Sequence, residues 1–278
     1  MNRLRRYAVP YLVWMGLFIL IPTVVLLVLA FSDLSLYRPG MFGLTLDNFA
    51  VFALSTTRRA IWNSFRFAGL AAILCFLIGY PVALYLSTLP AKTRKVLISL
   101  LIVPLWSNML LRINAWEKIF TANSIVTDVF GFSVDLVGTD AAIVLGMVAM
   151  YLPFMIFPIF SVLEKMDPKL VEAARDLGAD DAQTFFRVIF PLSGGGVISG
   201  FVMTFLPALT TFVLPAYLGL GKYTLIGTLI ESKFIKEAAD SNALSINQGS
   251  LISLFLMILS VTAFLLVIRV DKEGETLI

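Results

Sequence analysis

The sequence predicts an all-α membrane protein with six transmembrane helices and with both chain ends in the cytoplasm. Of its 278 residues, 59% are apolar and only 14% are charged, whereas soluble domains hold roughly 45–50% apolar and about 25% charged residues. Apolar runs that approach the length needed to cross a bilayer, about 20 residues, recur along the whole chain. Basic residues are concentrated in alternate loops, which gives the expected orientation.

The expected elements form a single transmembrane domain over residues 1–278. The expected spans lie at about 7–31, 65–88, 96–114, 141–163, 193–218 and 247–269. A cytoplasmic loop is expected at 164–191, and outer loops are expected at 32–64, 115–140 and 219–246. The resulting protein would be a multi-pass component of a bacterial inner membrane, in contact with lipid.

Two of these spans need a separate argument. The first span follows Arg3, Arg5 and Arg6, so a cleaved signal peptide is the alternative. Its apolar stretch is longer than the about 7–15 residues usual in a signal peptide, which favours a retained helix. The third span is the shortest, and it reaches a workable length only if Arg112 extends its side chain to the lipid headgroups.

The orientation depends most on the short loop between the second and third spans. Lys92, Arg94 and Lys95 lie close together in this loop. Short loops rich in Lys and Arg remain on the cytoplasmic side. We therefore expect this loop, the loop 164–191 and both chain ends to be cytoplasmic.

The composition excludes several kinds of chemistry. The chain has no histidine and a single cysteine, Cys75, so imidazole metal sites, histidine-based catalytic triads and disulfides within the chain are excluded. Its only approach to a phosphate-binding loop, Gly219 to Thr224, lacks the first glycine of that motif. We predict no catalytic residue, no metal site and no cofactor on this chain, and the net charge of +3 gives no reason to expect a nucleic acid.

The loop 164–191 is patterned as two short helices. Asp167 can cap the first helix, Pro168 suits its first position, and Gly178 can provide the left-handed residue that ends it. Asp180 and Gln183 have the spacing of a capping box for the second helix. Apolar residues share one face of the first helix at spacings of three and four: Leu170, Ala173, Ala174 and Leu177.

This loop resembles the EAA loop of ATP-binding-cassette (ABC) importer permeases. The glutamate, both alanines, the glycine and the proline of that motif match Glu172, Ala173, Ala174, Gly178 and Pro191. The resemblance implies the fold of a type I ABC importer permease, with a loop that docks on an ATPase through these residues and Asp176. It further implies a second, related permease, two cytoplasmic ATPase subunits that bind the ATP and Mg²⁺, and an extracytoplasmic substrate-binding protein. The alternative is a surface amphipathic helix without a partner.

A wider resemblance points to the spermidine/putrescine permease branch of this family, and it implies polyamine import by a subunit that is not itself an enzyme. The segments that carry it begin at Thr45, Ile78, Val103, Leu111 and Leu152, and they read TLDNF, IGYP, VPLWSN, LRI and LPFM. Two other functions remain as alternatives: a secondary transporter driven by an ion gradient, and an intramembrane enzyme. Both would ordinarily need ionisable groups inside the spans, and no Asp or Glu lies within the six runs.

Polar side chains in or beside the spans are the candidates for a translocation path, because each costs free energy in lipid. The candidates are Trp106, Asn108, Arg112, Thr204, Thr210, Thr211 and Tyr217. The alternative for Arg112 is a side chain extended to the headgroups, and for the threonines a hydrogen bond to their own helix. With Pro207 and Pro215, the threonines predict a bend near the centre of the fifth span.

Two further patterns complete the predictions. Gly196 and Gly200 have the spacing of a close helix-packing seam. Acidic residues in the outer loops are candidates for an acidic vestibule, with solvated loop charges as the alternative. They are Glu117, Asp128, Asp135, Asp140, Glu231, Glu237 and Asp240.

Overall fold

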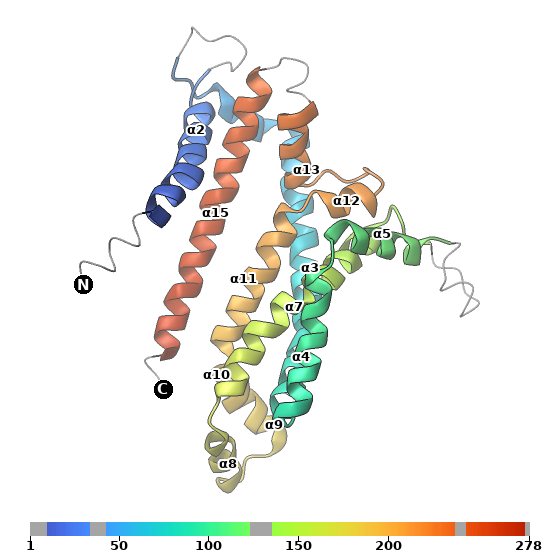
Figure 1. Cartoon of the computed structure of the whole chain (residues 1–278), viewed down its shortest axis with the longest axis vertical. Helices are drawn as coiled ribbons and strands as arrows, with labels where there is room; N and C mark the ends of the chain where they lie inside the picture. Colours follow the sequence, from blue (N-terminus) through green and yellow to red (C-terminus); the bar gives the residue numbers. More distant parts are fainter. Residues whose placement is uncertain (1–9, 34–42, 123–134, 237–242, 276–278) are drawn as a thin grey trace.

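The computed structural model describes residues 10–33, 43–122, 135–236 and 243–275, and these are almost entirely helical (Figure 1). The longer helices are Pro10–Ala30, whose second half is α2 (Ile21–Ala30), α3 (Ser55–Thr88), α4 (Ala91–Trp106), α5 (Met109–Phe120), α7 (Asp140–Lys165), α11 (Gly194–Thr210) and α15 (Ala243–Glu275). Shorter elements are η2 (Asp47–Ala53), α8 (Pro168–Asp176), α9 (Asp181–Thr184), η3 (Phe185–Ile189), α10 (Phe190–Leu192), α12 (Val213–Tyr217), α13 (Ile226–Glu231) and η4 (Ser232–Lys236).

The centre of the bundle is formed by α3, α7 and α11, which pack against one another (Figure 1). Close approach of α7 and α11 requires glycine, because a Cβ on Gly196 would lie 2.8 Å from the Pro158 carbonyl oxygen and a Cβ on Gly200 would lie 3.0 Å from that of Met155. The predicted packing seam at these two glycines is confirmed. Gly79 on α3 has a similar role, since its Cβ would lie 3.3 Å from Met155.

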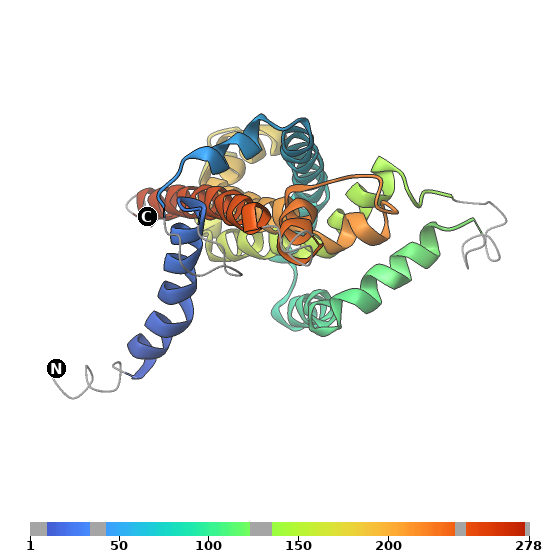
Figure 2. The same cartoon turned by 90° about the horizontal axis from the view of Figure 1, so that it is seen from above.

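The first span packs on the last helix of the chain. Helix α2 lies against α15, and viewed from above it projects away from the bundle (Figure 2). A buried amide on η2 bonds to the end of α2, because Asn48 Nδ2 donates to the carbonyl oxygens of Ala30 and Ser32 at 3.0 and 2.9 Å. Asn247 Nδ2 donates to the same Ser32 carbonyl at 3.0 Å. These bonds satisfy carbonyl groups that the end of α2 leaves without a helical partner.

The prediction of one continuous third span at 96–114 is wrong. Helix α4 ends at Trp106, and α5 leaves it at an angle of 97°. Ser107 is extended, and the Asn108 side chain accepts a hydrogen bond from the Leu110 N–H at 2.8 Å, so a new helix starts there. The uncharged run hid this break because asparagine is both a tolerated polar residue in a span and a preferred N-cap.

The bend predicted for the fifth span, 193–218, lies nearer the end of that span than its centre, at Thr210 and Thr211. Helix α11 runs without interruption through Pro207, and it ends at Thr210, where Thr211 becomes extended. A second change of direction, 62°, separates Asp181–Leu192 from Gly194–Thr210. Pro207 lies in the last turn of α11, where the one hydrogen bond that it cannot donate does not end the helix, and the breaks lie at the two ends of α11.

Helices extend beyond the apolar runs into the predicted outer loops. Helix α3 begins at Ser55, within the loop predicted at 32–64, and α13 and η4 lie within the loop predicted at 219–246. The last helix covers Ala243–Glu275, which exceeds the predicted 247–269 at both ends. Hydropathy locates the part of a helix that suits lipid, whereas a helix ends only where its backbone hydrogen bonding ends.

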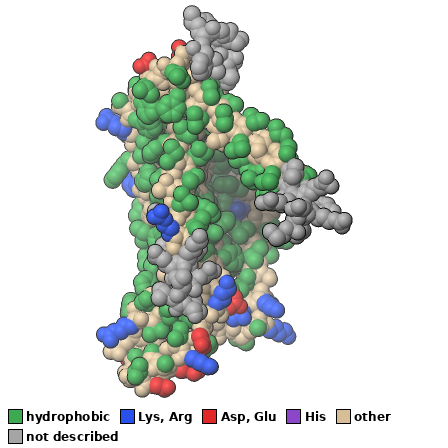
Figure 3. Space-filling model, turned by 90° about the vertical axis from the view of Figure 1, so that its left-hand side faces the viewer, with side chains coloured by type: hydrophobic (Ala, Val, Ile, Leu, Met, Phe, Trp, Pro, Cys, Tyr) green, Lys and Arg blue, Asp and Glu red, His purple; other side chains and the backbone are tan. Residues whose placement is uncertain are grey.

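Within the part of the chain that the structure describes, four helices are each long and apolar enough to cross a membrane, and up to six spans result if each bent pair counts as one. Charged side chains gather at the end of the molecule formed by α8 and α9, while hydrophobic side chains cover most of the middle (Figure 3). The predicted Lys92, Arg94 and Lys95 cluster lies at this same end, because Arg94 forms an ion pair of 2.9 Å with Glu164 in the last turn of α7. Arg3, Arg5 and Arg6 lie outside the described residues.

Candidate coupling and translocation sites

Helix α8 begins at the capping residues that the sequence predicts. The Asp167 carboxylate accepts a hydrogen bond from the Lys169 N–H at 3.0 Å, and Pro168 occupies the first helical position. The cap satisfies one of the free N–H groups of the first turn, and proline lacks another. The start of the helix is therefore determined by local sequence.

The end of α8 is a complete Schellman motif. Gly178 has a φ of +84°, its N–H donates to the Arg175 carbonyl at 2.9 Å, and the Ala179 N–H donates to the Ala174 carbonyl at 3.0 Å. A left-handed residue closed by these two hydrogen bonds is the glycine-terminated helix end that the sequence predicts. A side chain on Gly178 would meet no atom within 4 Å, so glycine is required here for its backbone conformation and not for space.

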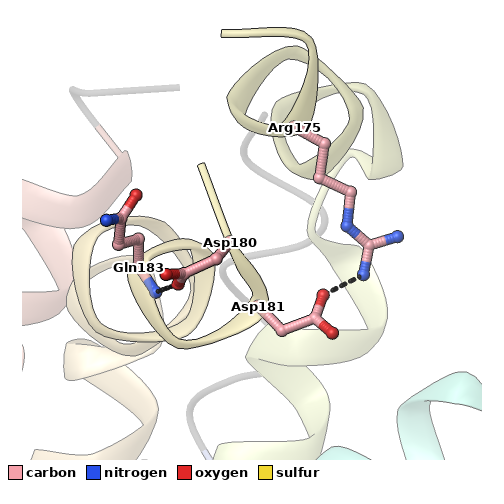
Figure 4. A network of polar contacts seen from close by, with 4 residues as sticks. All are labelled: Arg175, Asp180, Asp181 and Gln183. Carbon is pink, nitrogen blue, oxygen red and sulfur yellow. Dashed lines mark hydrogen bonds and ion pairs between the residues drawn. The ribbon is translucent and has the colours of Figure 1, made fainter. Parts of the chain in front are cut away.

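The second short helix is fixed to the first. The Asp180 carboxylate accepts a hydrogen bond from the Gln183 N–H at 2.7 Å, which caps α9, and the Arg175 guanidinium donates to Asp181 at 2.9 Å across the turn (Figure 4). This ion pair is exposed, and such pairs contribute at most about 1 kcal/mol. The caps and the pair together give α8, the turn and α9 one defined shape, which is called the coupling loop below.

The coupling loop exposes apolar side chains at the charged end of the molecule. Leu177, at the end of α8, is 89% exposed, and Phe186, in the adjoining η3, is 67% exposed. Surfaces with large exposed apolar groups beside charged ones commonly bind another protein. Leu177 belongs to the predicted apolar face of α8, but Phe186 was not among the predicted site residues; its place after a capped helix start was the signal available in the sequence.

The predicted coupling residues occupy one continuous part of this loop. Glu172, Ala173 and Asp176 are exposed on α8, Ala174 is half-buried, and Gly178 closes the helix. Pro191 lies beyond η3, in α10, and is also exposed. The structure therefore brings the first five together and separates Pro191 from them by α9 and η3.

The predicted path residues lie at two places on the opposite half of the molecule. Trp106 ends α4 and is 89% exposed, and Asn108 is the exposed cap of α5. Tyr217, in α12, is exposed too, and α12 packs on α5. The bend between α4 and α5 and the neighbouring α12 thus present two aromatic rings and one amide on the surface of the single chain.

A second group surrounds the break after α11. Tyr151 on α7 donates to the Pro207 carbonyl at 3.4 Å, and Thr211 Oγ1 and Arg112 Nε are buried without a hydrogen-bond partner among the described residues. The Pro207 carbonyl is among the last four of α11, which receive no hydrogen bond from a backbone N–H of the helix. The Tyr151 bond therefore joins α7 to the last turn of α11. Tyr151 was not predicted, although a phenol in the middle of an apolar run was a signal for it.

The other two threonines differ in their surroundings. Thr210 is exposed and donates to the Leu206 carbonyl of its own helix at 3.1 Å, as the alternative stated for it describes. Thr204 is completely buried, and its hydroxyl oxygen has no hydrogen-bond partner among the described residues. A path shared by two chains would run along the surface of each, so the enclosed position of Thr204 gives it no access to such a path in this conformation.

The predicted acidic vestibule is only partly within the described residues. Asp140 forms an ion pair with Arg66 on α3 and begins α7, where a carboxylate also suits the helix dipole. Asp135 is exposed, whereas Glu117 and Glu231 are half-buried. Asp128, Glu237 and Asp240 lie outside the described residues.

A bundle of apolar helices that carries a protruding pair of short helices at one charged end has the architecture expected of a membrane component that docks on another protein. Comparison with known proteins agrees with this class. A family model described as the inner membrane component of binding-protein-dependent transport systems matches residues 76–271. The chain belongs to this family, and it is therefore a transport subunit of the inner membrane and not an enzyme.

Individual relatives and solved structures are consistent with this assignment. The chain is 39% identical over 233 residues to the spermidine/putrescine transport system permease protein PotB of Haemophilus influenzae, covering 80% of each chain. It is 33% identical over 256 residues to PotB of Escherichia coli K12, covering 87% of this chain and 92% of the relative.

Solved permease structures share the fold. A chain of a bacterial ABC transporter that imports the acidic polysaccharide alginate superimposes with a TM-score of 0.74 at 16% identity, covering 96% of this chain and 95% of that chain. A chain of the methionine ABC transporter MetNI gives a TM-score of 0.53 at 18% identity, covering 78% of this chain and 95% of that chain. The all-α fold predicted for a type I ABC importer permease is confirmed.

Proposed function

We propose that this chain forms one half of the membrane path of an ABC importer for polyamines such as spermidine and putrescine. The observation that carries the proposal is the preformed coupling loop, whose caps, Schellman motif and exposed Leu177 suit insertion into a cleft on an ATPase, together with the exposed Phe186 in the adjoining η3. Similarity to the PotB permeases over most of the chain supports the substrate class. A second, related permease would supply the other half of the path.

In this proposal the coupling loop and both chain ends face the cytoplasm. The basic cluster at Lys92, Arg94 and Lys95 lies at the coupling-loop end of the bundle, and basic short loops remain inside. Two ATPase subunits bind ATP and Mg²⁺ and close against each other when ATP is bound. Each subunit docks on the coupling loop of one permease. An extracytoplasmic binding protein delivers the polyamine to the opposite end.

The proposed path begins at the surface shared by the α4–α5 bend and α12. Polyamines are flexible polycations, and aromatic faces attract cations by about 0.5–2 kcal/mol, more as water is excluded. Trp106 and Tyr217 present such faces. The carboxylates that a polycation also favours would come from the paired permease.

The test is transport by the assembled complex in proteoliposomes. The complex is purified with its native partners, and uptake of labelled spermidine is measured with ATP, without ATP, and with an imposed ion gradient. We expect uptake only with internal ATP, reduced by unlabelled putrescine and unaffected by a neutral sugar. Uptake driven by the gradient without ATP would overturn the proposal.

Docking by the coupling loop is tested with a matched pair of variants. Leu177→Asp places a charge on the exposed coupling surface, whereas Leu44→Asp places the same charge on an exposed leucine at the other end, which is 80% exposed. We expect Leu177→Asp to lower co-purification of the ATPase and Leu44→Asp to leave it unchanged. Equal retention of the ATPase by both variants would contradict docking at this loop.

A further inference from the structure

The coupling loop is connected to the membrane bundle through a bend. Ser193 lies at the 62° change of direction between Asp181–Leu192 and Gly194–Thr210, and its side chain is completely buried. On one side of the bend is the π-helix η3, and on the other three consecutive glycines begin α11. A Cβ on Gly194 would meet no atom within 4 Å. Glycine runs and π-turns both deform readily, so a force applied to the loop could be absorbed here.

Two buried hydroxyl groups fix this bend. The Tyr80 hydroxyl on α3 lies 2.8 Å from the Ser193 hydroxyl, and the Ser193 hydroxyl donates to the Phe190 carbonyl at 2.9 Å. A serine hydroxyl has one proton, and that proton is used for Phe190. Tyr80 must therefore donate to Ser193, which gives a directed chain of hydrogen bonds from α3 through the bend to α10.

Aromatic rings surround this hydrogen-bond chain. The Tyr80 ring contacts Phe185 edge-on, with centroids 5.7 Å apart, and contacts Phe190 at 5.6 Å. Phe76, one turn before Tyr80, contacts Phe201 on α11 at 5.6 Å. The cluster thus joins three segments: α3, the η3–α10 continuation of the coupling loop, and α11. Such ring pairs contribute beyond their buried area and have preferred geometry, so the cluster resists a change of angle.

We propose that Tyr80 and Ser193 form a latch that makes the coupling loop, α3 and α11 move as one unit, so that displacement of the loop by the ATPase reaches the membrane path. The inference rests on the proposed function. Tyr80 and Ser193 are positioning residues: they act through the loop and not on the substrate. Without the latch, the ATPase would still dock and hydrolyse ATP, but the bend at Ser193 would absorb part of the displacement.

The first experiment measures the number of substrate molecules moved per ATP hydrolysed by the complete complex in proteoliposomes. Tyr80→Phe keeps the ring and removes only the donated proton. We expect the ATPase to remain bound and hydrolysis to continue, while the ratio of uptake to hydrolysis falls about five-fold, which is the effect on an equilibrium of one typical hydrogen bond. Tyr85→Phe, the same change at an exposed position of the same helix, should leave the ratio unchanged.

Variants of Ser193 test the pair as a unit. Ser193→Ala should lower the ratio as Tyr80→Phe does, Ser193→Thr should restore it because the hydroxyl is kept, and the double variant should be no worse than the more severe single one. Purely additive losses in the double variant would overturn the latch. Loss of the ATPase during purification of Tyr80→Phe would also overturn it, since the residue would then support docking.

A second measurement does not depend on the substrate. Spin labels are placed at Gln183→Cys on α9 and Ile198→Cys on α11, in a Cys75→Ala background. The distance between the two labels in the assembled complex changes with the angle at the bend. We expect one narrow distance distribution in the parent and a broad one in Tyr80→Phe. Identical distributions would reject the latch even if polyamine uptake is confirmed, whereas a broadened distribution in a complex that moves no polyamine would support the latch and reject the proposed substrate.

Discussion

At the scale of single residues, several positions are determined by what would collide with a larger side chain. A Cβ on Gly227 would lie 2.2 Å from the Thr210 carbonyl oxygen and 2.7 Å from that of Thr211. Both atoms belong to the backbone at the end of α11, so neither can rotate away. The first turn of α13 therefore fits beside the break after α11 only because residue 227 is glycine.

We predict that Gly227→Ala destabilises the protein by about 1–3 kcal/mol, the range for an overpacked interior. The measurement is thermal unfolding in detergent, with Gly69→Ala as the control. Gly69 lies within α3, and its Cβ would meet no atom within 4 Å, so alanine there should be neutral or stabilising by up to about 1 kcal/mol. Equal stability of the two variants would show that the contact at Gly227 relaxes without cost.

Trp106 gives the residue-scale prediction for the path. Because its side chain is almost fully exposed, Trp106→Ala should change the unfolding temperature little and leave the ATPase bound. If the ring attracts the polycation, removal of about 1 kcal/mol of cation–π attraction should lower spermidine uptake roughly five-fold at low substrate. Trp62→Ala, on an exposed part of α3, is the control and should transport normally.

At the scale of elements, the short helix α8 shows how little tertiary support the coupling loop needs for its shape. Asp167, Pro168 and Gly178 set its two ends through contacts within the loop itself. Helix α8 has no buried residue, so its apolar face is available to another protein. The loop is thus a preformed docking element, which lowers the conformational entropy lost on binding.

We predict that Gly178→Ala weakens ATP-driven uptake, because a residue with a Cβ costs about 1–2 kcal/mol in the left-handed conformation. Gly221→Ala is a matched control: Gly221 also has a positive φ, +68°, and its Cβ would also meet no atom within 4 Å. Both variants carry similar backbone strain, so both should lose similar thermal stability. Only Gly178→Ala should lower the ratio of uptake to ATP hydrolysis.

A charge reversal on α8 tests the same loop by another property. Glu172→Lys leaves the helix caps intact and changes only an exposed side chain. We expect membrane insertion and thermal stability to be retained while ATP-dependent uptake falls at least ten-fold. A charge of the wrong sign in a docking surface commonly costs more than about 1.4 kcal/mol of binding free energy. Normal ATP-dependent uptake by this variant would argue against the loop as the coupling element.

At the scale of the whole molecule, helices α4 and α5 form an arm that has few packing partners within the single chain. Helix α4 has no buried residue, and viewed from above α5 extends away from the bundle (Figure 2). By contrast, 61% of the most apolar stretch of α7 is buried inside the protein. An arm of this kind is stabilised by lipid or by another subunit.

We predict that assembly with the second permease of the proposed complex protects the α4–α5 arm from hydrogen exchange. Amides around the break at Ser107 and Asn108 should exchange at least ten-fold more slowly in the complex than in the isolated chain in detergent, because the break leaves N–H groups without helical partners. Amides in the middle of α7 should change little. If the amides of the α4–α5 arm exchange at equal rates in both states, the proposed second permease must bind elsewhere on the molecule.

Local patterns in the chain are enough to predict the class of protein, the apolar part of each span, the caps and the glycine stop of α8, and the packing seam at Gly196 and Gly200. Each of these follows from residues close together in the chain or from their periodicity. Four features depend on how the helices pack: the 97° turn at Asn108, the break after Thr210, the bond from Tyr151 to the Pro207 carbonyl, and the bond from Tyr80 to Ser193. Tyr80 and Ser193 are 113 residues apart, and such pairs are selected only when helices pack, because burial removes the water that would otherwise satisfy their hydroxyls.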